Sequence, residues 1–294
     1  MHGYVRRWWR WQTKPFRHDA VMKIQLLSDL HLEAHPHWRA TPAAGADVLV
    51  LAGDVGSYQP GSLLTDSDFG LGQFSAASGW PTPVIFVPGN HEYDGMDFDA
   101  AHERLRATCA RLGLHWLERE TLTLHGVRFV GTTLWTDFDA LAPNADHSTT
   151  ALAQQLKARD KAYRAANYYL KKTLTTRRGA PWLAESVREQ ALVCQHWLRD
   201  ALAAPFDGPT VAVTHFAPSL RSADPRYGHV PGTAGFCNAL DDLLPHAKVW
   251  LHGHLHAPSN YVHQGCRVVA NPLGYARKNE QAAFLPGILI EIGA

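Results

Sequence analysis

Five stretches of the chain share one pattern, in which a short run of apolar and β-branched residues is followed at once by polar residues. The five stretches are residues 23–31, 47–54, 83–92, 210–216 and 248–256. Runs that are almost continuously apolar are typical of strands buried on both faces, as in layered α/β folds. The pattern therefore predicts five core strands in one α/β protein.

Other elements are predicted between these strands. Residues 97–113 and 186–204 repeat apolar side chains at helical spacing, and Gly113 suits the end of the first helix. Residues 122–132 have the pattern of a β-hairpin that turns at His125–Gly126. The last apolar run, "PGILIEIG", predicts a closing strand.

Each predicted core strand ends in side chains that bind metals well. They are Asp29, His31, Asp54, Asn90, His91, His215, His254 and His256. In α/β sheets functional groups gather beyond the carboxyl ends of the strands. A mixture of imidazole, carboxylate and amide ligands without thiolate suits Mn, Fe, Zn or Co. We therefore expect a metal centre at one edge of the sheet.

The polar blocks stand in the order D-x-H, G-D, G-N-H-E, H and G-H-x-H. With these blocks the sequence resembles the calcineurin-like metallophosphoesterase superfamily, from Met22 to about the end of the chain. The resemblance implies a four-layer αββα sandwich with two facing, mostly mixed β-sheets. It also implies a dinuclear metal site at the carboxyl ends of the strands.

The resemblance assigns a role to each block. It implies that Asp29, His31 and His256 hold one divalent ion and that Asn90, His215 and His254 hold the other. Asp54 would bridge the two ions and His91 would be the catalytic histidine without a metal. The neighbouring Glu92 and His252 would orient these residues from a second layer, and Asn90 and His91 would contact substrate.

The expected function is metal-dependent hydrolysis of phosphoesters, with phosphodiesters favoured over monoesters. A hydroxide that bridges the two ions would attack phosphorus directly. Two alternatives stay open: a nuclease acting on DNA or RNA, and a non-catalytic interaction module with the same fold. Retention of every ligand position argues against the second.

Substrate recognition is less defined by the sequence. Arg221, in the long loop after His215, is a candidate substrate contact. Related chains often carry an arginine where this one has Leu273. A helical, basic insertion is expected at about residues 145–185, with eight Lys or Arg residues within 151–180 and one acidic residue, Asp160. It would either attract an anionic substrate or be a solvated helix face.

Composition limits the remaining possibilities. The net charge is +1, from 28 Lys+Arg and 27 Asp+Glu, so global charge indicates no particular partner. Four widely spaced cysteines exclude a thiolate zinc site and favour the cytoplasm. No apolar run is long enough to span a membrane. Residues 1–21 are expected to be a basic, aromatic tail outside a phosphoesterase domain at 22–294.

Overall fold

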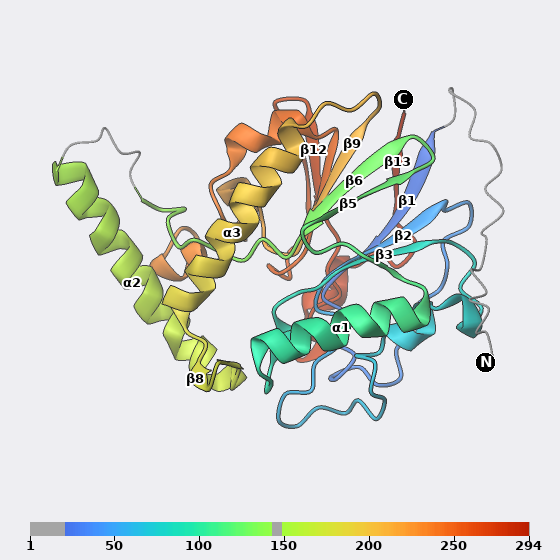
Figure 1. Cartoon of the computed structure of the whole chain (residues 1–294), viewed down its shortest axis with the longest axis horizontal. Coiled ribbons are helices and arrows are strands. Elements are labelled where there is room, and N and C mark those ends of the chain that lie inside the picture. The colour runs from blue at the N-terminus through green and yellow to red at the C-terminus, as the bar shows by residue number, and fades with distance from the viewer. Residues whose placement is uncertain (1–20, 143–148, 294) are drawn as a thin grey trace, which may run out of the picture.

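The computed structural model describes residues 21–142 and 149–293 and places two β-sheets face to face (Figure 1). The first sheet has the strand order β13-β1-β2-β3-β4. Strands β1 to β4 are parallel, and β13 pairs with β1 in the antiparallel sense. The strands are β1 (Met22–Leu27), β2 (Val48–Ala52), β3 (Val84–Val87), β4 (His115–Trp116) and β13 (Leu289–Ile292).

The second sheet is also mixed, with the order β11-β12-β10-β9-β6-β5. Its four central strands are parallel, while β5 and β11 are antiparallel to their neighbours. The strands are β5 (Glu120–Leu124), β6 (Val127–Thr132), β9 (Thr210–Thr214), β10 (Val249–His252), β11 (Ser259–His263) and β12 (Cys266–Ala270). A two-stranded ribbon of β7 (Thr176–Arg177) and β8 (Ala180–Pro181) completes the β-structure of the described residues.

Alternate residues of the central strands enter two different hydrophobic cores. Leu26 and Val50 of the first sheet pack against the same inner cluster as Val211 and Leu251 of the second. The next residue along β1, Leu27, faces the outer cluster instead. Because successive strand residues point to opposite faces, both faces of each sheet are covered. This burial explains why these strands are almost continuously apolar.

Helices cover the outer faces of the two sheets and complete the four layers. Helix α1 (Phe98–Leu112) begins at Asp97, whose side chain accepts from the backbone N–H groups of Asp99 and Ala100, and ends at Gly113. Helix α3 (Ala184–Ala203) packs against β6. The predicted four-layer sandwich with two mixed sheets is confirmed.

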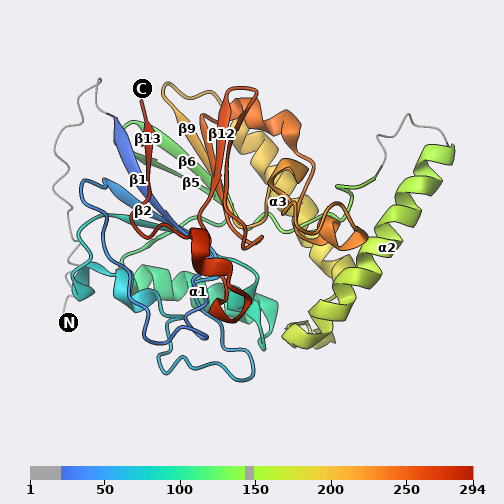
Figure 2. The same ribbon diagram turned by 180° about the vertical axis from the view of Figure 1, so that it is seen from behind.

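Helix α2 (Thr149–Thr173) extends away from the sandwich in Figures 1 and 2. Among its described side chains only Ala151 and Ala162 are buried, and it packs mainly on the turn Pro231–Gly235. The basic insertion predicted from the sequence corresponds to this helix and the β7–β8 ribbon. The tail expected at residues 1–21 lies, except for Val21, outside the described part of the chain. No helix within the described residues has the length and apolar character needed to cross a membrane.

Candidate metal centre

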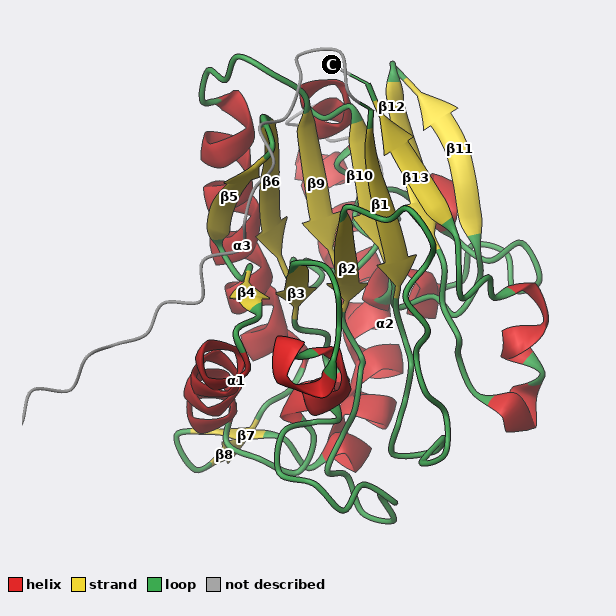
Figure 3. Cartoon of the chain, turned by 90° about the vertical axis from the view of Figure 1, so that its right-hand side faces the viewer, coloured by secondary structure: helices red, strands yellow, loops and turns green. Residues whose placement is uncertain are grey.

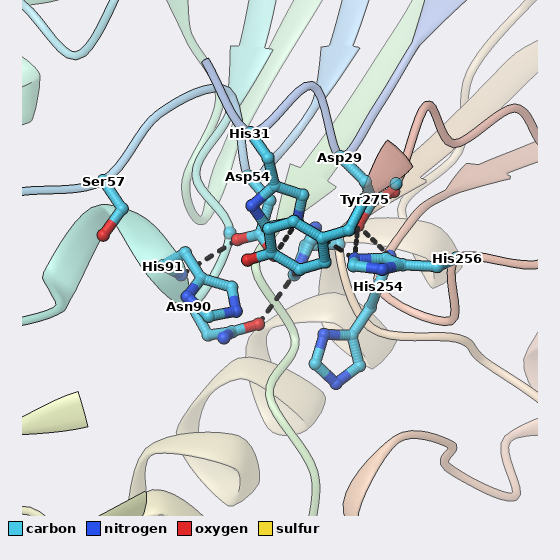
Figure 4. A network of polar contacts seen from close by, with 12 residues as sticks. Asp29, His31, Asp54, Ser57, Asn90, His91, His254, His256 and Tyr275 are labelled. Atoms are coloured by element: carbon cyan, nitrogen blue, oxygen red, sulfur yellow. Dashed lines mark hydrogen bonds and ion pairs between the residues drawn. The ribbon is translucent and has the colours of Figure 1, made fainter. Parts of the chain in front are cut away.

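The candidate ligands come from five strands of the two sheets and meet at one edge of the sandwich. Parallel strands carry their carboxyl ends to a common edge, as Figure 3 shows for β1, β2 and β9. Asp29 and His31 follow β1, Asp54 follows β2, Asn90 and His91 follow β3, His215 follows β9, and His254 and His256 follow β10. Figure 4 shows the labelled members of this set gathered at one place.

Five of the candidate ligands adopt a left-handed backbone conformation. Their φ angles are 52° at Asp29, 45° at His31, 53° at Asp54, 72° at His254 and 49° at His256. Residues other than glycine adopt this conformation at a cost of about 1–3 kcal/mol each, and such residues cluster at functional sites. The chain therefore bends sharply at the residues that bring ligand atoms into the site.

The ligand atoms form two groups that share one carboxylate. The first group consists of Asp29, His31, Asp54 and His256, and the second of Asp54, His215 and His254. Within each group one ligand atom per residue lies within 4.8 Å of every other. This spacing fits two cations that share Asp54 as a ligand.

The first group brings two imidazole nitrogens close together. His31 Nε2 lies 3.0 Å from His256 Nε2, and His256 Nε2 lies 3.5 Å from Asp29 Oδ1. Asp29 and His31 are fully buried. Nitrogen lone pairs that face each other inside the protein repel unless a proton or a cation lies between them.

The second group places Asn90 beside His215. His215 Nε2 is 3.1 Å from Asn90 Oδ1 and 3.2 Å from Asp54 Oδ2. The same Asp54 oxygen lies 3.8 Å from His31 Nε2 in the first group. Asp54 Oδ2 therefore lies between the two groups.

Hydrogen bonds fix the orientation of three ligand imidazoles. The Nδ1 atoms of His31, His215 and His256 donate to Glu33 Oε1 (2.9 Å), the Ala52 carbonyl (2.8 Å) and Glu280 Oε2 (2.7 Å). With Nδ1 protonated, the neutral ring presents the lone pair of Nε2 to the centre. Carboxylates and carbonyls that bind ligand histidines in this way are typical of metal sites.

The chemistry of the donor set fits divalent ions. Asp29 Oδ2, Asp54 Oδ2 and His254 Nε2 are buried without a hydrogen-bond partner in the described residues. Buried polar atoms are otherwise nearly always paired. Burial opposes protonation of His215, but the Asp54 carboxylate outweighs it and raises the pKa of His215 to about 9. The carboxylates thus create a site that attracts positive charge.

His91 lies beside both groups without entering either. Its Nδ1 is 2.5 Å from Asp94 Oδ2, and its backbone N–H donates to Asp54 Oδ1 (2.9 Å). Burial lowers the pKa of the His91 imidazole, but Asp94 and Asp54 outweigh it and hold that pKa well above its usual value. The geometry leaves Nε2 of His91 available to a substrate.

Glu92 contacts the loops that carry candidate ligands, whereas His252 bonds to other residues. The Glu92 carboxylate accepts from the backbone N–H groups of Asp54 (3.1 Å), Val55 (2.6 Å) and Gly89 (2.7 Å), so it joins the loops after β2 and β3. His252 is buried, which lowers its pKa to about 4, and its Nε2 shares a hydrogen bond with Ser222 Oγ (3.0 Å). It belongs to neither group of candidate ligands.

Some contacts near the site differ from the sequence predictions, and three carboxylates there were not predicted at all. Arg221 forms an ion pair with Asp241 (Nε to Oδ1, 3.0 Å), so its role in substrate binding stays a prediction. Sequence reasoning missed Glu33, Asp94 and Glu280, which bind site histidines. Glu33 and Asp94 follow His31 and His91 by two and three residues, a spacing that would have indicated them. Glu280 stands 24 residues after His256, and no local pattern indicates it.

Gly89 allows the loop after β3 to approach Asp54. A Cβ at this position would collide with Asp54 Oδ1 and with the Asp54 backbone nitrogen. We expect Gly89→Ala to lower turnover by about 10²-fold, because displacement of a catalytic group by about 1 Å has that effect. Gly287→Ala is the control, since a Cβ there meets nothing within 4 Å. Steady-state kinetics and metal content that match the unsubstituted protein would contradict this role for Gly89.

An α/β sandwich with this His/Asp cluster at its strand ends fits a metal-dependent hydrolase. The model of the calcineurin-like phosphoesterase family matches residues 22–258, and the chain belongs to this family. Family membership supports metal-dependent hydrolysis of phosphoesters. It agrees with the resemblance inferred from the five polar blocks.

The chain is similar in sequence to a curated protein and in fold to a solved structure. The chain is 26% identical over 223 residues to the uncharacterized protein L509 of Acanthamoeba polyphaga mimivirus, covering 71% of this chain and 73% of that one. The crystal structure of phosphopantetheinyl hydrolase from Mycobacterium tuberculosis superposes with a TM-score of 0.66 at 20% identity. That superposition covers 93% of this chain and 96% of the other. At this identity the likeness establishes the shared fold.

Proposed function

We propose that the protein is a phosphodiesterase with a dinuclear metal centre. Asp29, His31 and His256 would hold one divalent ion, and Asn90, His215 and His254 the other, with Asp54 shared. The observation that carries the proposal is the pair of ligand groups joined at Asp54. Mn, Fe, Zn and Co suit this set of nitrogen and oxygen donors.

Divalent ions bound there would supply Lewis acidity toward the phosphoryl oxygens and would activate a water molecule. The protein's part is to hold the reacting groups in line. Asp29 and Asp54 contribute two negative charges against about four positive charges from two ions. The net positive charge would attract a phosphate group, and the low dielectric of the buried site would strengthen that attraction.

His91 is the proposed proton donor to the leaving oxygen. Asp94 holds its Nδ1, which leaves Nε2 to face the substrate. The backbone of His91 is fixed by Asp54 Oδ1, so the imidazole keeps a constant relation to the shared ligand. Asn90, in the adjacent position, would contact substrate from the second ligand group.

Charge favours a diester over a monoester. A phosphodiester carries one negative charge and a monoester close to two at neutral pH. Leu273 is buried where relatives often have an arginine, so the described site lacks that cation beside the phosphate. A site with less positive charge discriminates less strongly in favour of the more highly charged monoester.

The test compares an aryl phosphodiester with the matching monoester in the presence of Mn, Fe, Zn or Co. We expect faster turnover of the diester. A phosphopantetheinyl substrate belongs in the panel because the structural relative is named for that activity. Faster turnover of the monoester would overturn the diester assignment, and absence of turnover with every metal would overturn the proposed activity.

Removal of the metal is expected to destabilise the protein. A ligand that binds only the native state at 100 times its Kd stabilises that state by about 2.7 kcal/mol. For a domain of this size that corresponds to a Tm increase of about 5 °C. Thermal unfolding with EDTA and with Mn²⁺ measures the difference. Equal Tm values despite measured metal binding would contradict a buried site formed by the native fold.

A nuclease is the second candidate function, because helix α2 carries exposed lysines. The structure pairs Arg159 with Asp139, Arg164 with Asp160 and Arg177 with Asp99, which reduces the free charge of the basic insertion. Four exposed lysines have no carboxylate partner in the described chain: Lys157, Lys161, Lys171 and Lys172. The carboxyl end of α2 accepts a hydrogen bond from Gly95, one residue after Asp94 (2.8 Å).

This candidate predicts binding of single-stranded DNA or RNA whose affinity falls steeply with salt. Replacing the four lysines by glutamine should weaken binding at least about 10-fold and flatten the salt dependence. Fluorescence anisotropy with a labelled oligonucleotide measures both effects. Unchanged binding in this variant would show that α2 does not contact the nucleic acid.

We further propose the cytoplasm as the location. Cys109, Cys194, Cys237 and Cys266 are free thiols and all are buried. Free thiols are common where the redox environment is reducing. The test is to label the protein, fractionate the cells and measure the share of label in the cytoplasmic fraction.

A further inference from the structure

Residues 273–280 pass directly over the candidate metal centre, beyond the residues that the family model matches. The backbone N–H groups of Leu273 and Gly274 donate to the carbonyls of Ser28 (3.0 Å) and Asp29 (2.9 Å). The segment is thereby attached to the loop that carries Asp29 and His31. Its side chains are candidates for substrate contact that the five polar blocks do not contain.

Tyr275 is the residue of this segment that enters the site. Its ring stacks on the imidazole of His31, with centroids 4.1 Å apart and planes inclined by 27°. It also lies 5.3 Å from the ring of His256. In Figure 4 the phenol lies across the candidate ligands, with its hydroxyl directed toward His91 and Asp54. The hydroxyl oxygen also forms a hydrogen bond with the side chain of Gln59. Because an amide N–H donates in such a contact, the phenol keeps its own O–H to donate toward the candidate ligands.

Glu280 couples the position of Tyr275 to a candidate ligand. Its Oε2 accepts from the backbone N–H of Tyr275 (2.8 Å) and from His256 Nδ1 (2.7 Å). A Cβ on Gly274 would meet the Glu280 side chain, so the turn is closely packed. One carboxylate therefore orients both a ligand imidazole and the tyrosine above it.

The same turn carries positive charge. The Arg277 guanidinium carbon and Lys278 Nζ each lie 5.2 Å from the centroid of the Tyr275 ring, and both side chains are exposed. Leu273 occupies the position of the expected arginine and is buried. Lys278 Nζ is also 3.8 Å from Glu280 Oε1, so part of this charge is paired within the turn.

We propose that Tyr275 is a substrate contact whose hydroxyl donates a hydrogen bond to a phosphoryl oxygen. The inference rests on the proposed phosphoesterase function. A phenol is protonated at neutral pH and needs no change of charge to donate. A hydrogen bond to a charged oxygen contributes more than one between neutral groups.

The test compares Tyr275→Phe, which keeps the ring, with Tyr275→Leu, which removes it. Loss of a hydrogen bond to a charged group predicts a fall in kcat/KM of about 10- to 100-fold for Tyr275→Phe. The inhibition constant for inorganic phosphate should rise by a similar factor, while metal content and Tm stay unchanged. Tyr58→Phe is the control, because it removes a phenol that bonds to Asp66 and Phe69 outside the site.

Unchanged kcat/KM and phosphate inhibition in Tyr275→Phe would overturn the inference, leaving the ring as packing for His31. The Tyr275→Leu variant then shows that packing role by a loss of metal or a lower Tm. If the unsubstituted protein hydrolyses no phosphoester, the proposed function fails. Calorimetric titration of the metal-loaded protein with phosphate still decides the role of Tyr275, since weaker binding in Tyr275→Phe supports it and equal binding refutes it.

Discussion

Replacing Asp54 by alanine is expected to lower phosphoester hydrolysis by at least about 10³-fold and to reduce the amount of bound metal. Asp54 Oδ2 lies between the two ligand groups and is buried without a hydrogen-bond partner among the described residues. Loss of the shared ligand weakens both cation positions, and a factor of 10³ corresponds to about 4 kcal/mol of transition-state stabilisation.

Metal analysis after desalting and steady-state kinetics measure the two effects of Asp54→Ala. Asp54→Asn preserves the volume of the side chain and separates loss of charge from loss of packing. Asp207→Ala, at an exposed loop position, is the control for removal of a carboxylate. Turnover retained in Asp54→Ala would refute the shared-ligand role.

Replacing His91 by alanine is expected to lower kcat by about 10²–10⁴-fold while metal content stays unchanged. His91 belongs to neither ligand group, and Asp94 holds its Nδ1. Because the proposed role is protonation of the leaving oxygen, the loss should be larger for an alkyl diester than for an aryl diester with a good leaving group. His196→Ala is the control, since that imidazole is 84% exposed on α3.

An equal loss for aryl and alkyl diesters would remove the proton-donor role and leave His91 as an electrostatic or positioning group. A loss of metal in His91→Ala would instead place this residue among the groups that hold the cations. Asp94→Asn should reproduce part of the effect, because it weakens the contact that orients the imidazole.

The sequence indicates the core strands and the candidate ligands together because each ligand follows its strand within a few residues. Once parallel pairing is inferred, the carboxyl ends of the strands must converge, and the side chains converge with them. The hairpin of β11 and β12 was not predicted. Its strand β11 alternates half-buried and exposed residues, and Val262 is 69% exposed, so it lacks the apolar run that indicates the central strands.

Contacts between distant segments could not be predicted from local pattern. Tyr275 and Glu280 reach the site because the chain leaves β10, forms a hairpin and returns over His31. The sequence also overstated the unpaired positive charge of the basic insertion. Two of its arginines pair with Asp139 and Asp99, which lie outside the insertion in sequence. In both examples the contact joins residues that are neighbours only in the folded chain.

The contribution of both sheets to one centre has a consequence for the order of events during synthesis. Asp29, His31 and Asp54 leave the ribosome early, whereas His254 and His256 emerge about 200 residues later. β1 also lacks its antiparallel neighbour until β13 has been synthesised, because Met22 of β1 pairs with Ile292 of β13. We therefore expect a nascent chain to acquire its cations only after β10 and β13 have both been translated.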